Sequence, residues 1–81
     1  MRYRLEFAEG FEKRIASISM PHLRRALLTT LEAVSALENP RSHGGTRHGG
    51  KFWGYPVFGS FFICCQIDDT DKVIRVFDIS V

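Results

Sequence analysis

A short basic segment rich in glycine is the part of this 81-residue chain whose residue types could do chemistry. Residues 39–51 read Asn-Pro-Arg-Ser-His-Gly-Gly-Thr-Arg-His-Gly-Gly-Lys and contain no acidic residue. Glycine pairs let backbone amides come close to a phosphate, and arginine and lysine supply positive charge. The segment is not a Walker loop, because the Gly-Lys-Ser/Thr ending is absent. It predicts either a phosphate-contacting loop or a flexible surface connection.

Two histidines, His43 and His48, lie in this segment five positions apart. An ordinary histidine titrates near neutral pH, so His48 beside Arg47 could act as a general acid or base. A metal site would need a third and a fourth ligand, and the remaining histidine, His22, belongs to a predicted helix. We therefore expect neither a metal nor any other cofactor.

Aromatic residues are concentrated just after the basic segment. Six of the ten lie between positions 52 and 62, namely Phe52, Trp53, Tyr55, Phe58, Phe61 and Phe62. Such a cluster can stack nucleic-acid bases on a sheet face, or it can form the core of a small domain. The pattern alone leaves both interpretations open.

Composition limits the class of protein. The chain is long enough for one domain, residues 1–81, with a small core that a partner would help to stabilise. Residues 1–51 carry nine basic and five acidic residues, whereas residues 52–81 carry two basic and four acidic residues, so the first part could face a polyanion or simply be solvated.

Adjacent Cys64 and Cys65 point to opposite faces of a strand, which disfavours a disulfide. Without an apolar stretch of about 18 residues or a signal-like start, we expect a cytoplasmic protein with no membrane segment.

Hydrophobic periodicity predicts the elements of the first half. Tyr3 to Phe7 alternates as a half-buried strand, and Phe7, Phe11, Ile15 and Ile18 follow one face of a first helix. A second apolar stripe predicts a helix over residues 21–37, which Pro40 ends. Residues 39–51 are expected to form a loop.

The second half predicts only strands. Residues 52–69 read as a hairpin that turns at Gly59-Ser60, and Asp68-Asp69-Thr70-Asp71 as a solvated turn. Residues 73–81 are apolar on both faces and predict a central strand. The fold class is therefore α+β in the order β-α-α-β-β-β, with two helices packed on one face of an antiparallel sheet. The core should bring Leu27, Leu31 and Val34 onto Phe61, Ile63 and Phe77.

The whole chain resembles the RelE/ParE superfamily, the toxins of type II toxin–antitoxin modules. The first strand at Tyr3 to Phe7, the two helices and the last strand at Lys72 to Val81 are similar in kind and order. Residues 37–41, Leu-Glu-Asn-Pro-Arg, are similar to the acid/Asn-Pro-Arg ending of the family's long helix. Residues 54–69 align with its G-x-Y-R-V-R-V-G-D-Y-R-V-I-x-x-I-D-D frame. The resemblance implies a compact α+β domain that a cognate antitoxin wraps and inhibits.

The resemblance also implies two activities. RelE-like members cleave mRNA in the ribosomal A site, where the 2′-hydroxyl attacks the adjacent phosphate, and ParE-like members inhibit DNA gyrase without catalysis. Lys51 falls close to a lysine of the ribonucleases. Val57 and Phe62 stand where the family has arginines, and its terminal arginine and tyrosine or histidine would lie beyond Val81. An apolar side chain cannot neutralise a phosphate, so much of the usual nuclease site is missing.

Three hypotheses follow from these residues. In the first, the chain is a ribosome-dependent mRNA endoribonuclease whose catalytic residues are Lys51, His48 and Arg47, with Arg41 and His43 binding RNA phosphate. In the second, it is a ParE-like inhibitor of DNA gyrase. In the third, it is an inactive family member that serves as an antitoxin-binding interaction module. In each case the expected partner is a cognate antitoxin, joined in the first hypothesis by the ribosome and mRNA.

Overall fold

The computed structural model describes residues 2–48, 52–58 and 61–80. The chain runs through β1 (Arg4–Phe7), α1 (Phe11–Ala16), α2 (Pro21–Ala36), a 3-10 helix η1 (Pro40–His43), β2 (Thr46–His48), β3 (Phe52–Phe58), β4 (Phe61–Asp68) and β5 (Val73–Ser80). The strands form one sheet in the order β1-β5-β4-β3-β2. Only the β1–β5 pair is parallel among these described strands, so the predicted α+β fold class is confirmed.

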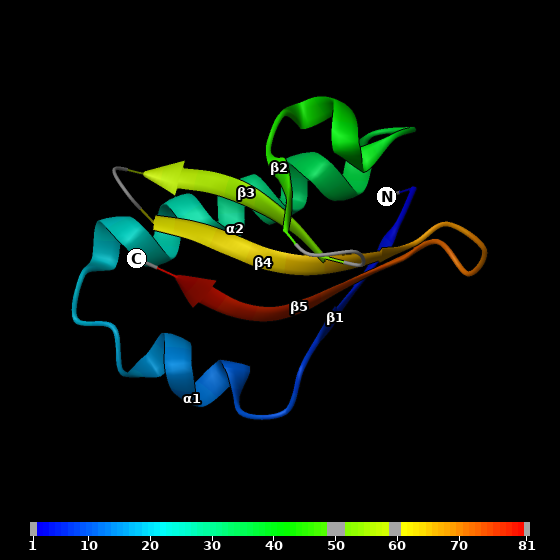
Figure 1. The fold of residues 1–81 in the computed structure, drawn as a ribbon. Helices are drawn as coiled ribbons and strands as arrows, with labels where there is room; N and C mark the ends of the chain where they lie inside the picture. The colour runs from blue at the N-terminus through cyan, green and yellow to red at the C-terminus, as the bar shows by residue number, and fades with distance from the viewer. Residues whose placement is uncertain (1, 49–51, 59–60, 81) are drawn as a thin grey trace.

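Both helices pack on one face of the sheet. Figure 1 shows α2 lying across β3 and β4, with α1 beyond β5. Leu27, Leu31 and Val34 of α2 are almost fully buried and share one core cluster with Phe11 of α1 and Ile63 of β4. Phe61 is half-buried against the same cluster, so this part of the predicted core is confirmed.

Phe77 does not belong to that core. The β4–β5 register pairs Cys64 with Asp78 but Cys65 with Val76, which leaves Phe77 as the extra residue of a β-bulge. Its ring lies edge-on to Phe52 and is 38% exposed. The prediction for Phe77 is wrong because its neighbour Val76 faces the helices, so Phe77 lies on the opposite face of β5, and the bulge then brings Ile79 rather than Asp78 into the core.

The helices differ from their predicted bounds to different degrees. α2 covers Pro21–Ala36, as the apolar stripe predicted, and begins with proline in its first turn. α1 has only six residues, because Gly10 takes a left-handed conformation at its N-cap with φ of 87°. Neither helix among the described residues is long and apolar enough to cross a lipid bilayer.

The strands of the second half follow the prediction with one addition. β5 lies between β1 and β4 and is therefore an internal strand, as its two apolar faces predicted. Cys65 is buried, Cys64 is half-buried, and both are free thiols. β2 is a fifth strand that the sequence did not predict. The predicted turn at Gly59-Ser60 lies outside the described residues.

Candidate functional site

The basic segment that follows α2 is folded rather than a free loop. Asn39 accepts a hydrogen bond from the backbone N–H of Arg41 at 3.1 Å and so caps η1. Gly44 and Gly45 then take positive φ angles of 101° and 94° and turn the chain into β2. The prediction of a loop over residues 39–51 is thus wrong for Pro40–His43 and Thr46–His48.

Two aromatic residues of β3 hold this segment in place. The hydroxyl of Tyr55 donates to the carbonyl of Pro40 at 2.8 Å, and both residues are buried. The indole N–H of Trp53 donates to the carbonyl of Gly44 at 3.0 Å. His43 lies edge-on to the Tyr55 ring, with centroids 6.1 Å apart. Burial raises the pKa of Tyr55, so its hydroxyl stays protonated and remains a donor.

Gly45 is required by both its backbone and its surroundings. A Cβ atom there would collide with the carbonyl oxygen of Gly54 and with the indole nitrogen of Trp53. Its φ of 94° is also unfavourable for any residue with a side chain. The glycine therefore lets β2 lie close against β3 instead of giving the segment freedom of movement.

Arg41, the predicted phosphate ligand, is engaged within the chain. Its guanidinium donates two hydrogen bonds of 3.1 Å to the carboxylate of Asp69 in the β4–β5 turn. The hydroxyl of Tyr3 donates to the same carboxylate at 2.8 Å. The hydrogen bonds from Arg41 and then from Tyr3 lower the pKa of Asp69 below its ordinary value. A phosphate would have to compete with this ion pair for Arg41.

Two of the three predicted catalytic residues, Arg47 and His48, lie on β2 at the edge of the sheet. β2 pairs antiparallel with β3, with Arg47 opposite Trp53 and His48 opposite Phe52. Arg47 and His43 are exposed. The side chain of His48 and the whole of Lys51 lie outside the described residues. Their assignment as catalytic residues stays a prediction, and the structure contributes the anchored edge strand that precedes Lys51.

Two positions that align with arginines in the resemblance described above, Val57 and Phe62, are apolar in structure as well as in sequence. Val57 is half-buried against the core on the helix-covered side. Phe62 is half-buried on the open face, where it lines a shallow hollow with Pro56 and Gly54 of β3 and Gly45 and Thr46 of the basic segment. Neither side chain can donate a hydrogen bond to a phosphate. This part of the open face offers aromatic and backbone surface instead of cations.

Arginines of the sheet and of α1 are already paired with carboxylates. Arg75 bonds Glu6 at 3.2 Å and lies 3.5 Å from Asp68, and Arg14 lies 3.4 Å from Asp78. These pairs reduce the positive charge that the sheet offers to a polyanion. Within the described ranges, no group of three or more His, Cys, Asp or Glu side chains is placed to hold a metal ion.

Sequence reasoning missed the residues that fix this site. Trp53 and Tyr55 were seen only as part of an aromatic cluster, and Asp69 only as part of a solvated turn. A signal was available, because tryptophan and tyrosine each carry one donor that must be satisfied when the ring is buried. Which carbonyl each donor reaches depends on the β2–β3 register, and periodicity does not supply it.

The arrangement of five strands and two helices defines an α+β domain, and comparison with solved structures identifies its type. No protein-family model and no curated protein matches the sequence. A mutant of the Escherichia coli toxin RelE with two arginines changed to alanine, bound to a peptide of antitoxin RelBc, has a TM-score of 0.80 at 23% identity, covering 98% of this chain and 82% of that chain.

Two complexes give similar results. The intact E. coli RelBE toxin–antitoxin complex has a TM-score of 0.78 at 22% identity, covering 96% of this chain and 94% of that chain. The archaeal RelE–RelB complex from Pyrococcus horikoshii OT3 has a TM-score of 0.70 at 20% identity, covering 99% of this chain and 94% of that chain. The chain therefore has the fold of the RelE toxins over nearly its whole length.

Proposed function

We propose that the chain is the toxin component of a type II toxin–antitoxin module. The observation that carries the proposal is its likeness to RelE structures over nearly the whole chain, including structures solved with the antitoxin RelB. The partner is then a cognate antitoxin. The site of action is the cytoplasm, where translation takes place.

For the mechanism, we propose cleavage of mRNA on the ribosome. The anchored edge strand supports this, because its hydrogen bonds fix the backbone of Arg47 and His48, and Lys51 follows His48 by three positions in the sequence. In such a reaction the 2′-hydroxyl attacks the neighbouring phosphate and the 5′-oxygen leaves. Arg47 and Lys51 would neutralise the charge that builds on the phosphate, and His48 would transfer a proton near neutral pH. Arg41 and His43 would contact a flanking phosphate.

A second candidate is inhibition without catalysis, with DNA gyrase as the alternative target. The specific observation in its favour is that Val57 and Phe62 stand where the nucleases have arginines, while Arg41 is paired with Asp69. On this account the chain blocks its target by binding alone. An inactive chain that only binds an antitoxin would share the same geometry.

Cell-free translation with purified protein tests the proposal. We expect protein synthesis to stop, mRNA to be cut only while it is being translated, and the product of the neighbouring open reading frame to restore synthesis. Intact mRNA together with impaired DNA supercoiling by gyrase would instead support the second candidate. Normal translation and normal supercoiling would contradict the toxin assignment.

Variants of the basic segment test the residues. Removing a group that stabilises transition-state charge commonly costs about 100-fold or more in rate. Arg47→Ala, His48→Ala and Lys51→Ala should each lower cleavage by about that factor. Arg25→Ala and His22→Ala are matched controls, since both residues are exposed on α2 away from the segment. Cleavage at the parental rate by all three variants would exclude the segment as the nuclease site.

A further inference from the structure

The aromatic cluster that follows the basic segment is divided between the two faces of the sheet. Trp53, Tyr55 and Phe61 lie in or against the core under the helices. Because side chains alternate along a strand, Phe52 of β3 and Phe62 of β4 lie on the opposite, open face. The core therefore accounts for only part of the cluster, and the remaining rings need another explanation.

One end of the open face is hollowed beside Phe62. Phe62 is paired with Pro56 across β4 and β3, and both side chains line the hollow. Gly45 and Gly54 also line it, and they present backbone without a side chain. The hollow has a volume of about 330 Å³, within the usual range of about 300–1,000 Å³ for a small-molecule site. It therefore has room for a flat ring between an aromatic side chain and bare backbone.

A second aromatic surface lies further along the same face. The rings of Phe52 and Phe77 are both exposed and meet edge-on, with centroids 5.4 Å apart. Phe52 is four residues before Pro56 on β3, so the two aromatic surfaces are about 13 Å apart along the strand. The small residues Gly54 and Cys64, which pair with each other, lie between them. The open face thus carries two aromatic surfaces joined by a low floor.

The charges around these surfaces suit a polyanion. Each carboxylate of the described strands is paired with an arginine: Glu6 and Asp68 with Arg75, and Asp78 with Arg14. The adjoining segment, residues 39–48, carries two arginines and two histidines and no acidic residue. A phosphodiester backbone beside the aromatic surfaces therefore meets positive charge on one side and neutralised carboxylates on the other.

We infer that the open face of the sheet is a base-stacking surface for single-stranded RNA, an inference that rests on the function proposed above. One base stacks on Phe62 in the hollow, and another base of the same strand stacks on the pair of Phe52 and Phe77, as bases do on aromatic side chains in single-strand readers. The phosphates lie toward the basic segment. Where the resemblance places an arginine, the ring of Phe62 holds the RNA by a base instead of a phosphate.

Fluorescence anisotropy with a labelled single-stranded RNA of about ten nucleotides tests this inference. Phe62→Leu keeps an apolar side chain and removes the ring, so affinity should fall by about fivefold or more, the loss of one stacked base. Phe62→Tyr keeps the ring and should bind within about twofold of the parent. Phe77→Leu repeats the test at an exposed position outside the core, and it should weaken binding by a similar factor.

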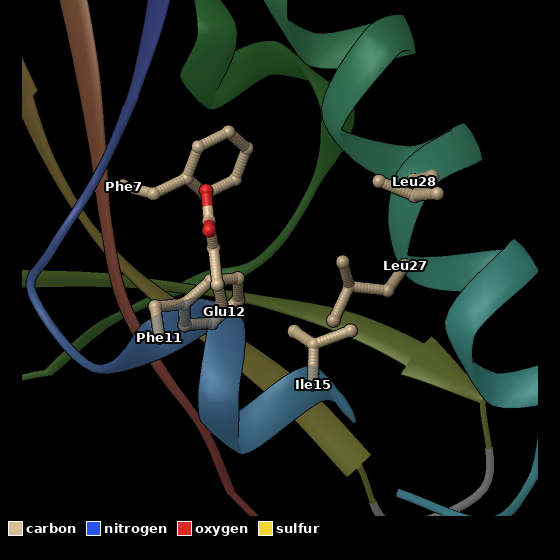
Figure 2. A pocket seen from close by; sticks show the side chains of 6 residues that line it. All are labelled: Phe7, Phe11, Glu12, Ile15, Leu27 and Leu28. Atoms are coloured by element: carbon tan, nitrogen blue, oxygen red, sulfur yellow. The ribbon is translucent and has the colours of Figure 1, made fainter. Parts of the chain in front are cut away.

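The matched control is Phe7→Leu, the same change at another exposed phenylalanine. Phe7 lies on the helix-covered side, where Figure 2 shows it with Phe11 and Ile15 around the space between α1 and α2. This variant should leave RNA affinity within about twofold of the parent. Raising the salt concentration should weaken every variant, but the ratio between the parent and Phe62→Leu should persist, because stacking is not a charge interaction.

The outcomes separate this inference from the proposed function. If the parent cuts translated mRNA but does not bind the RNA, or binds it no more tightly than Phe62→Leu and Phe77→Leu do, the stacking inference is wrong while the proposed function stands. If these variants lose affinity for the product of the neighbouring open reading frame and not for RNA, a protein occupies the face and the inference fails. If the parent neither binds the RNA nor cuts mRNA, both fail. A loss of RNA affinity confined to variants that remove a ring from the open face supports the inference.

Discussion

Replacing Tyr55 by phenylalanine removes one hydroxyl and leaves the ring in place. That hydroxyl donates to the carbonyl of Pro40 at 2.8 Å, and both residues are buried. Once the donor is gone, the carbonyl loses its partner in a place that water reaches poorly. A buried polar group left without a partner costs about 1–3 kcal/mol. We expect Tyr55→Phe to lower the free energy of unfolding by about 2 kcal/mol, within that range.

Thermal and urea unfolding followed by circular dichroism would measure the loss. For a domain of 60–100 residues, 1 kcal/mol corresponds to a shift in Tm of about 4–8 °C, so a decrease of roughly 8–16 °C is expected. Trp53→Phe is the comparison, because it also removes one donor to the basic segment, but from a hydrogen bond that is exposed to water. It should cost less, about 0.5–1 kcal/mol.

A loss below about 0.5 kcal/mol for Tyr55→Phe would refute the reasoning, because it would mean that the Pro40 carbonyl finds water in the variant. Equal losses for the two variants would show that burial of the Tyr55 bond adds nothing. The expected order, with Tyr55→Phe the more damaging, would establish that β3 fixes the start of the basic segment through a buried hydrogen bond.

Three further predictions concern the rest of the fold and the site. Because Arg41 holds the pKa of Asp69 below its ordinary value, the pair stabilises the fold above about pH 4, and this contribution is lost as the pH falls further. Arg41→Ala should therefore lower the free energy of unfolding by on the order of 1 kcal/mol at neutral pH, as for a partly exposed pair, and the difference from the parent should shrink below about pH 4. Leu31→Ala should cost about 2–5 kcal/mol in urea unfolding, since Leu31 is 1% exposed, and a loss below about 0.5 kcal/mol would place it at the surface. Gly45→Ala should destabilise the protein by more than the roughly 1 kcal/mol of an ordinary left-handed site, because the added methyl also meets β3; unchanged urea unfolding would contradict the close approach.

Most of the fold could be predicted because the hydrophobic residues of most elements follow the period of a helix or of a strand. The stripe through Leu27, Leu31 and Val34 repeats at helical spacing, and Pro21 and Pro40 mark its limits, so α2 was predicted nearly to the residue. The apolar faces of β5 likewise indicated an internal strand. These signals are local and depend little on the rest of the chain.

Features set by long-range register could not be predicted in this way. Phe77 lies outside the core because its neighbour Val76 takes the core face of β5; both faces of this strand are apolar in sequence, so its pattern did not show which face meets the helices. β2 has only three residues and forms because Trp53 and Tyr55 anchor the segment before it. A pattern-based interpretation therefore assigned this segment to a loop.

The candidate site was predicted only in part for a related reason. The basic residues of the segment were identified from composition, which needs no knowledge of the fold. The pairing of Arg41 with Asp69 joins positions 28 residues apart and depends on how η1 meets the β4–β5 turn. Sequence alone gave the charges but not which of them are already neutralised.

Controlled expression in growing cells is the most direct test of the central claim, that the chain is a toxin neutralised by a cognate partner. A toxin of this kind should arrest growth soon after induction of the chain alone, and growth should be normal when the neighbouring open reading frame is expressed with it. Uninterrupted growth with the folded chain accumulating and no partner present would contradict the claim.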